Sequence, residues 1–360
     1  MVSNQLLQLS YIVLFSFWAI SYFYALPVAL NLIVTSTAIV YIGSYRSLNL
    51  LVSEADGGLK KEDKETLSAN DAYKFPFIGS AALLSLYIAF KYFDKDTVNL
   101  LLSLYFSLVG VLTLTGSLSK FVSQFLTNPA RFGFKQKFPL IGEVDALFTF
   151  AELVSLMISI IFSAVYFKTK HFMMNNILGI SFCIQSIERI SLGSYKIGAI
   201  LLIGLFFYDI FWVFGTDVMV TVAKSFDGPI KLLFPRVIAS EGIKGEFSLL
   251  GLGDIVIPGL FVALLLRFDA HQAKAPIKFD VLPSSFAQPY FLVNVVSYAL
   301  GLLATVAVMF FFKAAQPALL YLVPACLGGS AIVATVKGEW GAMFAYNEEK
   351  KEEETEKKQQ

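Results

Sequence analysis

Long apolar runs separated by short polar stretches dominate the pattern along the chain. No charged residue occurs before Arg46, so the first 45 residues form one apolar stretch, with Pro27 near its middle. A helix needs about 20 mainly apolar residues to cross about 30 Å of hydrocarbon, so this stretch is too long for one crossing. We predict a membrane span at 27–45 and treat 7–25 as a separate apolar segment, either a signal sequence or an additional membrane segment.

Eight further apolar runs have the length of a membrane-spanning helix. They cover residues 76–93, 98–118, 147–167, 172–190, 197–217, 249–267, 289–312 and 316–336. The runs are continuous rather than alternating, which argues against a transmembrane β-barrel. The pattern predicts an all-α, polytopic membrane protein with nine transmembrane helices. Its parts are an apolar N-terminal segment at 1–26, a nine-span domain at 27–346 and a charged tail at 347–360.

The composition agrees with this class of protein. The chain is 56% hydrophobic and 15% charged, whereas soluble domains are about 25% charged. Its net charge of +1 provides no basic surface for nucleic acid. Cys183 and Cys326 both lie in apolar runs, which argues against a disulfide framework or a thiolate metal site. We therefore expect neither a nucleic-acid partner nor a metal.

The distribution of basic residues predicts the orientation in the membrane. With nine spans and a cytosolic C-terminus, 19 of the 28 Lys and Arg residues lie on the cytosolic side, as the positive-inside rule requires. The tail at 348–358 has ten charged residues in eleven and should be solvated. Lys357 and Lys358 resemble a dilysine signal for retrieval to the endoplasmic reticulum. The alternative is a chance pair in a Lys- and Glu-rich tail.

Two acids lie in apolar runs without an obvious basic partner. Asp209 belongs to a segment free of Lys and Arg from 197 to 223, and Asp254 lies near the start of the next span. An Asp at a helix centre is unfavourable by about 2.5–3.5 kcal/mol on insertion scales, which indicates a function. At helical rise the two acids lie about 12 Å and about 8 Å from the same membrane face, so the spacing permits a pair. Two close carboxyls share a proton, as in aspartic-protease chemistry.

Short motifs surround these two acids. Gly251 and Gly253 lack side chains and permit close approach of the backbone before Asp254. Tyr208 either hydrogen-bonds near the acids or packs among its aromatic neighbours. The segment formed by Gln316, Pro317, Ala318 and Leu319 begins the last span. Pro317 favours an extended conformation at Gln316, which would offer main-chain groups to a substrate strand. The alternative is a proline in the first turn of a helix.

Tyr208-Asp209, Gly251-Leu252-Gly253-Asp254 and Pro317-Ala318-Leu319 occur in this order on three separate spans. They resemble the YD, GxGD and PAL motifs of the intramembrane aspartyl proteases, which comprise the presenilin and signal peptide peptidase families. Residues 207–226, 229–235, 250–269 and 316–326 resemble the signal peptide peptidase family more closely. We judge that the resemblance covers about 27–346.

The resemblance implies an activity. Asp209 and Asp254 would be the catalytic aspartates, 317–319 would position the substrate, and no metal or organic cofactor would be used. The partners would be the lipid bilayer and type II-oriented transmembrane segments, such as signal peptides left by signal peptidase. The location would be the endoplasmic reticulum membrane, with a lumenal N-terminus and a cytosolic C-terminus. Assembly into a homo-oligomer stays open.

Two other functions remain as alternatives. Paired intramembrane acids also serve as proton relays in transporters, but the chain shows no repeat of two matching halves. A non-proteolytic scaffold for membrane quality control on the same fold is the second alternative. Both acids are present, so loss of activity is not indicated.

Overall fold

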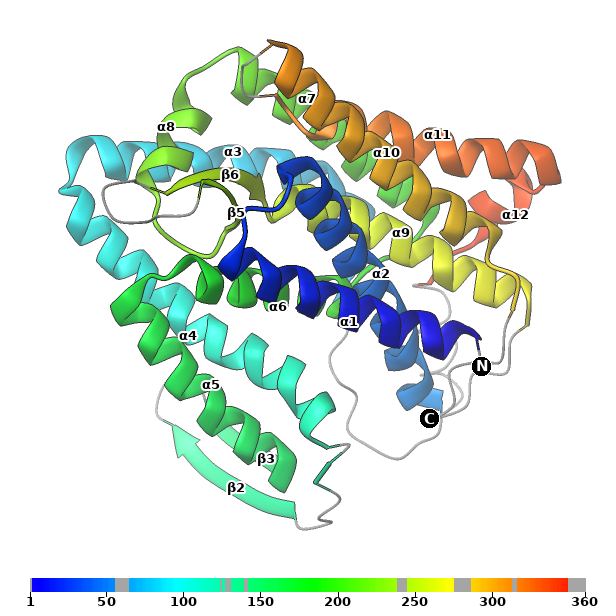
Figure 1. Ribbon diagram of the computed structural model, residues 1–360. Helices are drawn as coiled ribbons and strands as arrows, with labels where there is room; N and C mark the ends of the chain where they lie inside the picture. The colour runs from blue at the N-terminus through cyan, green and yellow to red at the C-terminus, as the bar shows by residue number, and fades with distance from the viewer. Residues whose placement is uncertain are drawn as a thin grey trace.

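The protein is a bundle of long helices (Figure 1). The computed structural model describes residues 2–55, 65–123, 125–126, 131–138, 142–237, 245–274, 286–312 and 316–348. Each of the nine predicted spans corresponds to one helix: α2 (Val28–Ala55), α3 (Ala69–Tyr92), α4 (Lys95–Val122), α5 (Phe150–Thr169), α6 (Phe172–Arg189), α7 (Tyr195–Phe214), α9 (Gly253–Gln272), α10 (Pro289–Phe312) and α11 (Leu319–Lys337). The N-terminal apolar segment forms α1 (Val2–Phe23). Two short helices, α8 (Val218–Ser225) and α12 (Trp340–Ala345), complete the described helices.

Eight of the described helices are long and apolar enough to cross a membrane. They are α1, α2, α3, α4, α5, α7, α10 and α11. The set includes α1 and omits α6 and α9, both of which contain charged residues. The all-α polytopic class is therefore confirmed, whereas the count of nine crossings stays a prediction.

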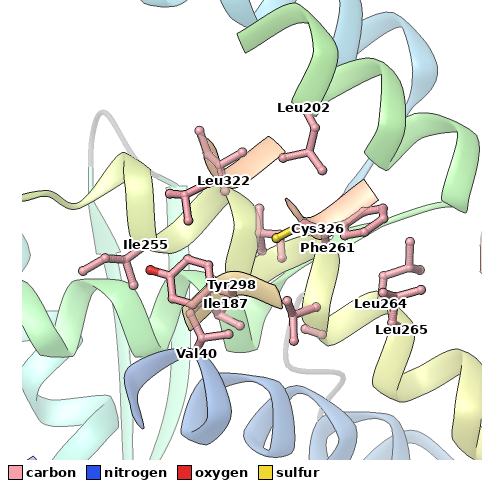
Figure 2. Packing of buried hydrophobic residues seen from close by; sticks show 14 of the residues in the cluster. Val40, Ile187, Leu202, Ile255, Phe261, Leu264, Leu265, Tyr298, Leu322 and Cys326 are labelled. Carbon is pink, nitrogen blue, oxygen red and sulfur yellow. The ribbon is translucent and has the colours of Figure 1, made fainter. Parts of the chain in front are cut away.

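Helix α9 is the central element of the bundle. It contacts α2, α6, α7, α10 and α11, and every residue from Ile257 to Ala270 is buried. Figure 1 shows α9 in yellow, with α2 in blue on one side and α10 and α11 in orange on the other. Gly43 and Gly259 allow α2 and α9 to approach Ile187 of α6, because an added Cβ at Gly43 would lie 2.8 Å from Ile187 Cβ. Figure 2 shows this core, with Ile187 beside Val40.

Short strands connect several of the helices. The prediction of an all-α protein did not include these strands. β1 (Glu65–Leu67) pairs in parallel with β4 (Ile190–Leu192), and β2 (Arg131–Phe138) pairs antiparallel with β3 (Gly142–Thr149). β5 (Lys231–Val237) forms a second antiparallel hairpin with β6 (Glu246–Gly251). The spans predicted at 147–167 and 249–267 therefore start too early. Hydropathy counts apolar residues and does not separate the end of a strand from the start of a helix.

The segment after α12 folds back onto the bundle. Asn347 forms a β-bridge with Ser194, and the Glu348 N–H donates to the Gly193 carbonyl at 2.7 Å. The Glu348 carboxylate is buried against Arg267 of α9, with 2.7 Å between Oε1 and Nε. Residues 347 and 348 thus belong to the folded bundle, although we predicted that the tail begins at 347. Lys357 and Lys358 lie outside the described residues.

Candidate active site

Asp209 lies on α7 and is almost fully buried, at 3% exposure. Its Oδ2 atom accepts a hydrogen bond of 3.0 Å from the Leu319 N–H. Leu319 is the first residue of α11, so its N–H has no partner within that helix. The helix dipole also favours a negative charge at this end. The start of α11 therefore holds the Asp209 side chain in a fixed position.

The segment formed by Gln316, Pro317 and Ala318 leads directly into α11. The Leu320 and Leu322 N–H groups donate to the Pro317 and Ala318 carbonyls at 3.3 and 3.1 Å. Ala318 is the N-cap residue, and Pro317 and Gln316 precede the helix. Pro317 therefore directly precedes the N-cap, and the extended conformation predicted at Gln316 stays a prediction.

Asp254 lies in the first turn of α9 and is half-buried. Strand β6 ends at Gly251, three residues earlier, so the chain changes from strand to helix beside this carboxyl group. A Cβ added at Gly251 would lie 3.3 Å from Asp254 Oδ2 and would crowd it. A Cβ at Gly253 would meet nothing within 4 Å. Gly251 is therefore the glycine whose missing side chain leaves room for Asp254.

The bundle brings the two aspartates together. Helices α7 and α9 contact each other, and both contact α11. The carboxyls of Asp209 and Asp254 are close enough to interact electrostatically. The three motifs separated in sequence thus meet at one place.

Tyr208 packs against its neighbours. Its ring centroid lies 6.3 Å from that of Trp212, and its Cε2 atom would be 3.6 Å from a Cβ added at Gly79 of α3. Trp212 in turn donates from Nε1 to Ser80 Oγ at 3.0 Å. These contacts match the packing interpretation of Tyr208 and hold α7 against α3.

The hairpin that leads into Asp254 is anchored by asparagines of α6. Asn176 accepts from the Leu233 N–H and donates to the Leu233 carbonyl, both at 2.8 Å. Asn175 donates to the Lys231 carbonyl at 2.9 Å. We did not predict this hairpin. Burial alternates from Ser248 to Leu250, but the sequence does not show the alternation, because the buried Ser248 is polar and the exposed Leu249 is apolar.

This anchoring determines which edge of the hairpin is open. The N–H and carbonyl of Leu233 point towards α6 and away from β6. Leu249 is the residue opposite Leu233 in the antiparallel register. Because two such opposite residues do not bond to each other, the N–H and carbonyl of Leu249 also point away from the partner strand. Leu249 is 45% exposed. The outer edge of β6 therefore carries main-chain groups directed away from the hairpin, directly before Gly251 and Asp254.

Known proteins match most of the chain. The model of the signal peptide peptidase family matches residues 59–350. Signal peptide peptidases of Mus musculus and Homo sapiens are each 43% identical to this chain over 319 residues. The match covers 86% of this chain and 80% of each relative. A probable intramembrane protease of Schizosaccharomyces pombe is 37% identical over 297 residues, covering 81% of this chain and 88% of its own. The family match includes all the residues of the site described above.

Proposed function

Because this chain belongs to the signal peptide peptidase family of intramembrane proteases, we propose that it is an aspartic endopeptidase with Asp209 and Asp254 as its catalytic pair. The hydrogen bond from the Leu319 N–H to the buried Asp209 carboxylate carries the proposal, since it joins the PAL segment to a catalytic acid. The proposed substrates are type II-oriented transmembrane segments, such as remnant signal peptides. The proposed location is the endoplasmic reticulum membrane, with the N-terminus in the lumen and the C-terminus in the cytosol.

The two carboxyls share the proton transfers of the reaction. One carboxylate takes a proton from a water molecule while the oxygen of that water attacks the scissile carbonyl carbon. The other carboxyl, protonated, donates a hydrogen bond to the carbonyl oxygen, and a proton then passes to the leaving amine. Leu319 occupies one lone pair of Asp209 Oδ2, which leaves Oδ1 for the water or the substrate.

The open edge of β6 is a binding site for an extended substrate. A transmembrane helix hides its peptide groups in its own hydrogen bonds, so cleavage requires local unwinding. An unwound segment recovers those hydrogen bonds by pairing with the main chain at Leu249, in the manner of β-augmentation. The next peptide of such a strand lies beside Asp254, and Gln316 and Pro317 border the site at the start of α11.

Cleavage of a signal-peptide-derived reporter in liposomes tests the catalytic assignment. We expect the wild type to cleave and Asp209→Ala and Asp254→Ala to be inactive but folded, because each removes an acid that is unfavourable in the membrane. Asp217→Ala is the matched control, since Asp217 makes no side-chain cap hydrogen bond on α8 and should tolerate the change. Cleavage by either active-site variant would refute the pair. A folded wild type that cleaves none of several substrates would instead favour the scaffold function.

Substitutions at the strand edge test the substrate site. Leu249→Pro removes an edge N–H, and proline is tolerated on edge strands, so the hairpin should persist while cleavage falls. Leu249→Val retains the N–H and should cleave at nearly the wild-type rate. Equal rates for the two variants would show that substrates do not pair with β6.

A further inference from the structure

Pro258 leaves the main-chain carbonyl of Asp254 without its helical partner. In an α-helix the carbonyl of residue 254 accepts from the N–H of residue 258. Proline has no N–H, and its ring pushes against the carbonyl four residues earlier. Pro258 lies inside α9 and is buried. The residue that carries the catalytic carboxyl therefore needs a hydrogen-bond donor from another helix, because an unpaired buried carbonyl is unfavourable.

Tyr298 of α10 supplies that donor. Its hydroxyl donates to the Asp254 carbonyl oxygen at 3.3 Å, across 44 residues of sequence. The Tyr298 side chain is completely buried, at 0% exposure, so neither water nor lipid reaches it to compete. Figure 2 shows the Tyr298 hydroxyl oxygen directed towards the turn of α9 that carries Ile255.

We propose that Tyr298 is a positioning residue for the reaction, which fixes the backbone of Asp254 through the carbonyl that Pro258 leaves unpaired. This inference rests on the proposed function of Asp254. A carboxyl on the first turn of a helix moves with its backbone, and a displacement of about 1 Å in an active site reduces rates by as much as about a hundredfold. Tyr298 is enclosed by protein, and its hydroxyl also interacts with Ser36 of α2, so its proposed effect on the reaction passes through the backbone of Asp254.

The test measures kcat and KM of the full-length protein with the reporter in liposomes. We expect Tyr298→Phe to lower kcat by about tenfold, because it removes one hydrogen bond to a buried group, while KM stays unchanged. Tyr195→Phe is the matched control. Tyr195 is also buried, but its hydroxyl pairs with Ser330 Oγ at 3.0 Å rather than with the active site.

A double-mutant cycle separates positioning from packing. Pro258→Ala restores the N–H at position 258, so in that background the Asp254 carbonyl has a helical donor and Tyr298→Phe should change kcat by less than about twofold. Pro258→Leu restores the same N–H and replaces Pro258→Ala if the latter does not fold. A tenfold loss that persists in the restored background would overturn the inference, as would an equal loss in Tyr195→Phe or no loss in Tyr298→Phe.

Asp254→Ala in the same assay keeps this inference apart from the proposed function. If Asp254→Ala cleaves, the proposed catalytic role is wrong and the role of Tyr298 is wrong with it. If Asp254→Ala is inactive and Tyr298→Phe retains the wild-type kcat, only the positioning role is refuted.

Discussion

Removal of the Glu348 carboxylate should destabilise the whole bundle, although this residue lies at the start of a highly charged tail. Glu348 pairs with Arg267, and the two side chains are 6% and 0% exposed. The other Arg267 nitrogens donate to Ser47 Oγ at 2.9 Å and Ser191 Oγ at 3.3 Å. Burial raises the pKa of Tyr346, so its hydroxyl stays protonated and donates to Glu348 at 3.0 Å.

The expected loss of stability in Glu348→Ala follows from the burial of the ion pair between Glu348 and Arg267. Glu348→Ala leaves the Arg267 guanidinium buried without its counter-ion, which destabilises a protein by about 3–5 kcal/mol. At about 2 °C per kcal/mol for a large chain, the unfolding midpoint should fall by about 6–10 °C. Replacement of both charges, in Arg267→Met with Glu348→Leu, should recover much of this loss because no unpaired charge remains.

Thermal unfolding in detergent, followed by tryptophan fluorescence, measures these shifts. Lys337→Met is the matched control: Lys337 and Glu339 form an exposed pair at 3.9 Å, worth about 0–1 kcal/mol. A midpoint for Glu348→Ala within about 2 °C of this control would refute the stabilising role of the buried pair. A double variant that is no more stable than Glu348→Ala would refute it as well.

Three further predictions concern the periphery of the site and the core. Burial lowers the pKa of Lys170, so the folded state disfavours the charged form of this side chain. Stability should therefore rise as the pH increases from that lowered pKa towards the ordinary value of 10.5. Lys170→Met should abolish this rise in melting curves recorded at several pH values. Asn176→Leu removes both hydrogen bonds to Leu233, so amide exchange of Leu233 measured by mass spectrometry should accelerate and cleavage should fall. Gly43→Ala should destabilise by about 1–3 kcal/mol through its contact with Ile187, with partial recovery in Gly43→Ala/Ile187→Ala.

Each of these predictions has a contrary result. An identical pH dependence in wild type and Lys170→Met would remove the role assigned to its burial. Unchanged exchange at Leu233 would mean that the hydrogen bonds of Asn176 do not hold β5 in place. For the core contact, Gly328→Ala on α11 is the control, since an added Cβ there meets nothing within 4 Å; if it destabilises as much as Gly43→Ala, crowding is not the cause.

The helices and the two acids could be predicted from sequence because both depend on local pattern. A run of about 20 apolar residues has few structural solutions in a membrane. Asp209 stands out because nothing near it in sequence neutralises its charge. The prediction that Asp209 and Asp254 share one site needed only the antiparallel direction of two consecutive spans joined by one loop.

The remaining features depend on contacts between distant segments. Glu348 looks like a solvated tail residue until Arg267, 81 positions earlier, is seen beside it. Tyr298 is one aromatic among many in an apolar run, and its role emerges only when α10 lies against Pro258. The β5–β6 hairpin is held by Asn175 and Asn176, 56 and 57 residues before the strand positions that they bind. No local pattern contains these pairings.

The burial of α9 has a consequence for biosynthesis. This helix is enclosed by protein from Ile257 to Ala270, and it carries the buried Arg267 and Asp269. A nascent chain released after α9 lacks α10, whose Tyr290 and Phe291 N–H groups bind the Asp269 carboxylate, and also lacks Glu348. We expect such a truncated chain to integrate α9 less completely than the whole protein does, which a glycosylation acceptor placed after residue 274 would report. The central helix would then be fully stabilised in the bilayer only once α10 and Glu348 have been synthesised.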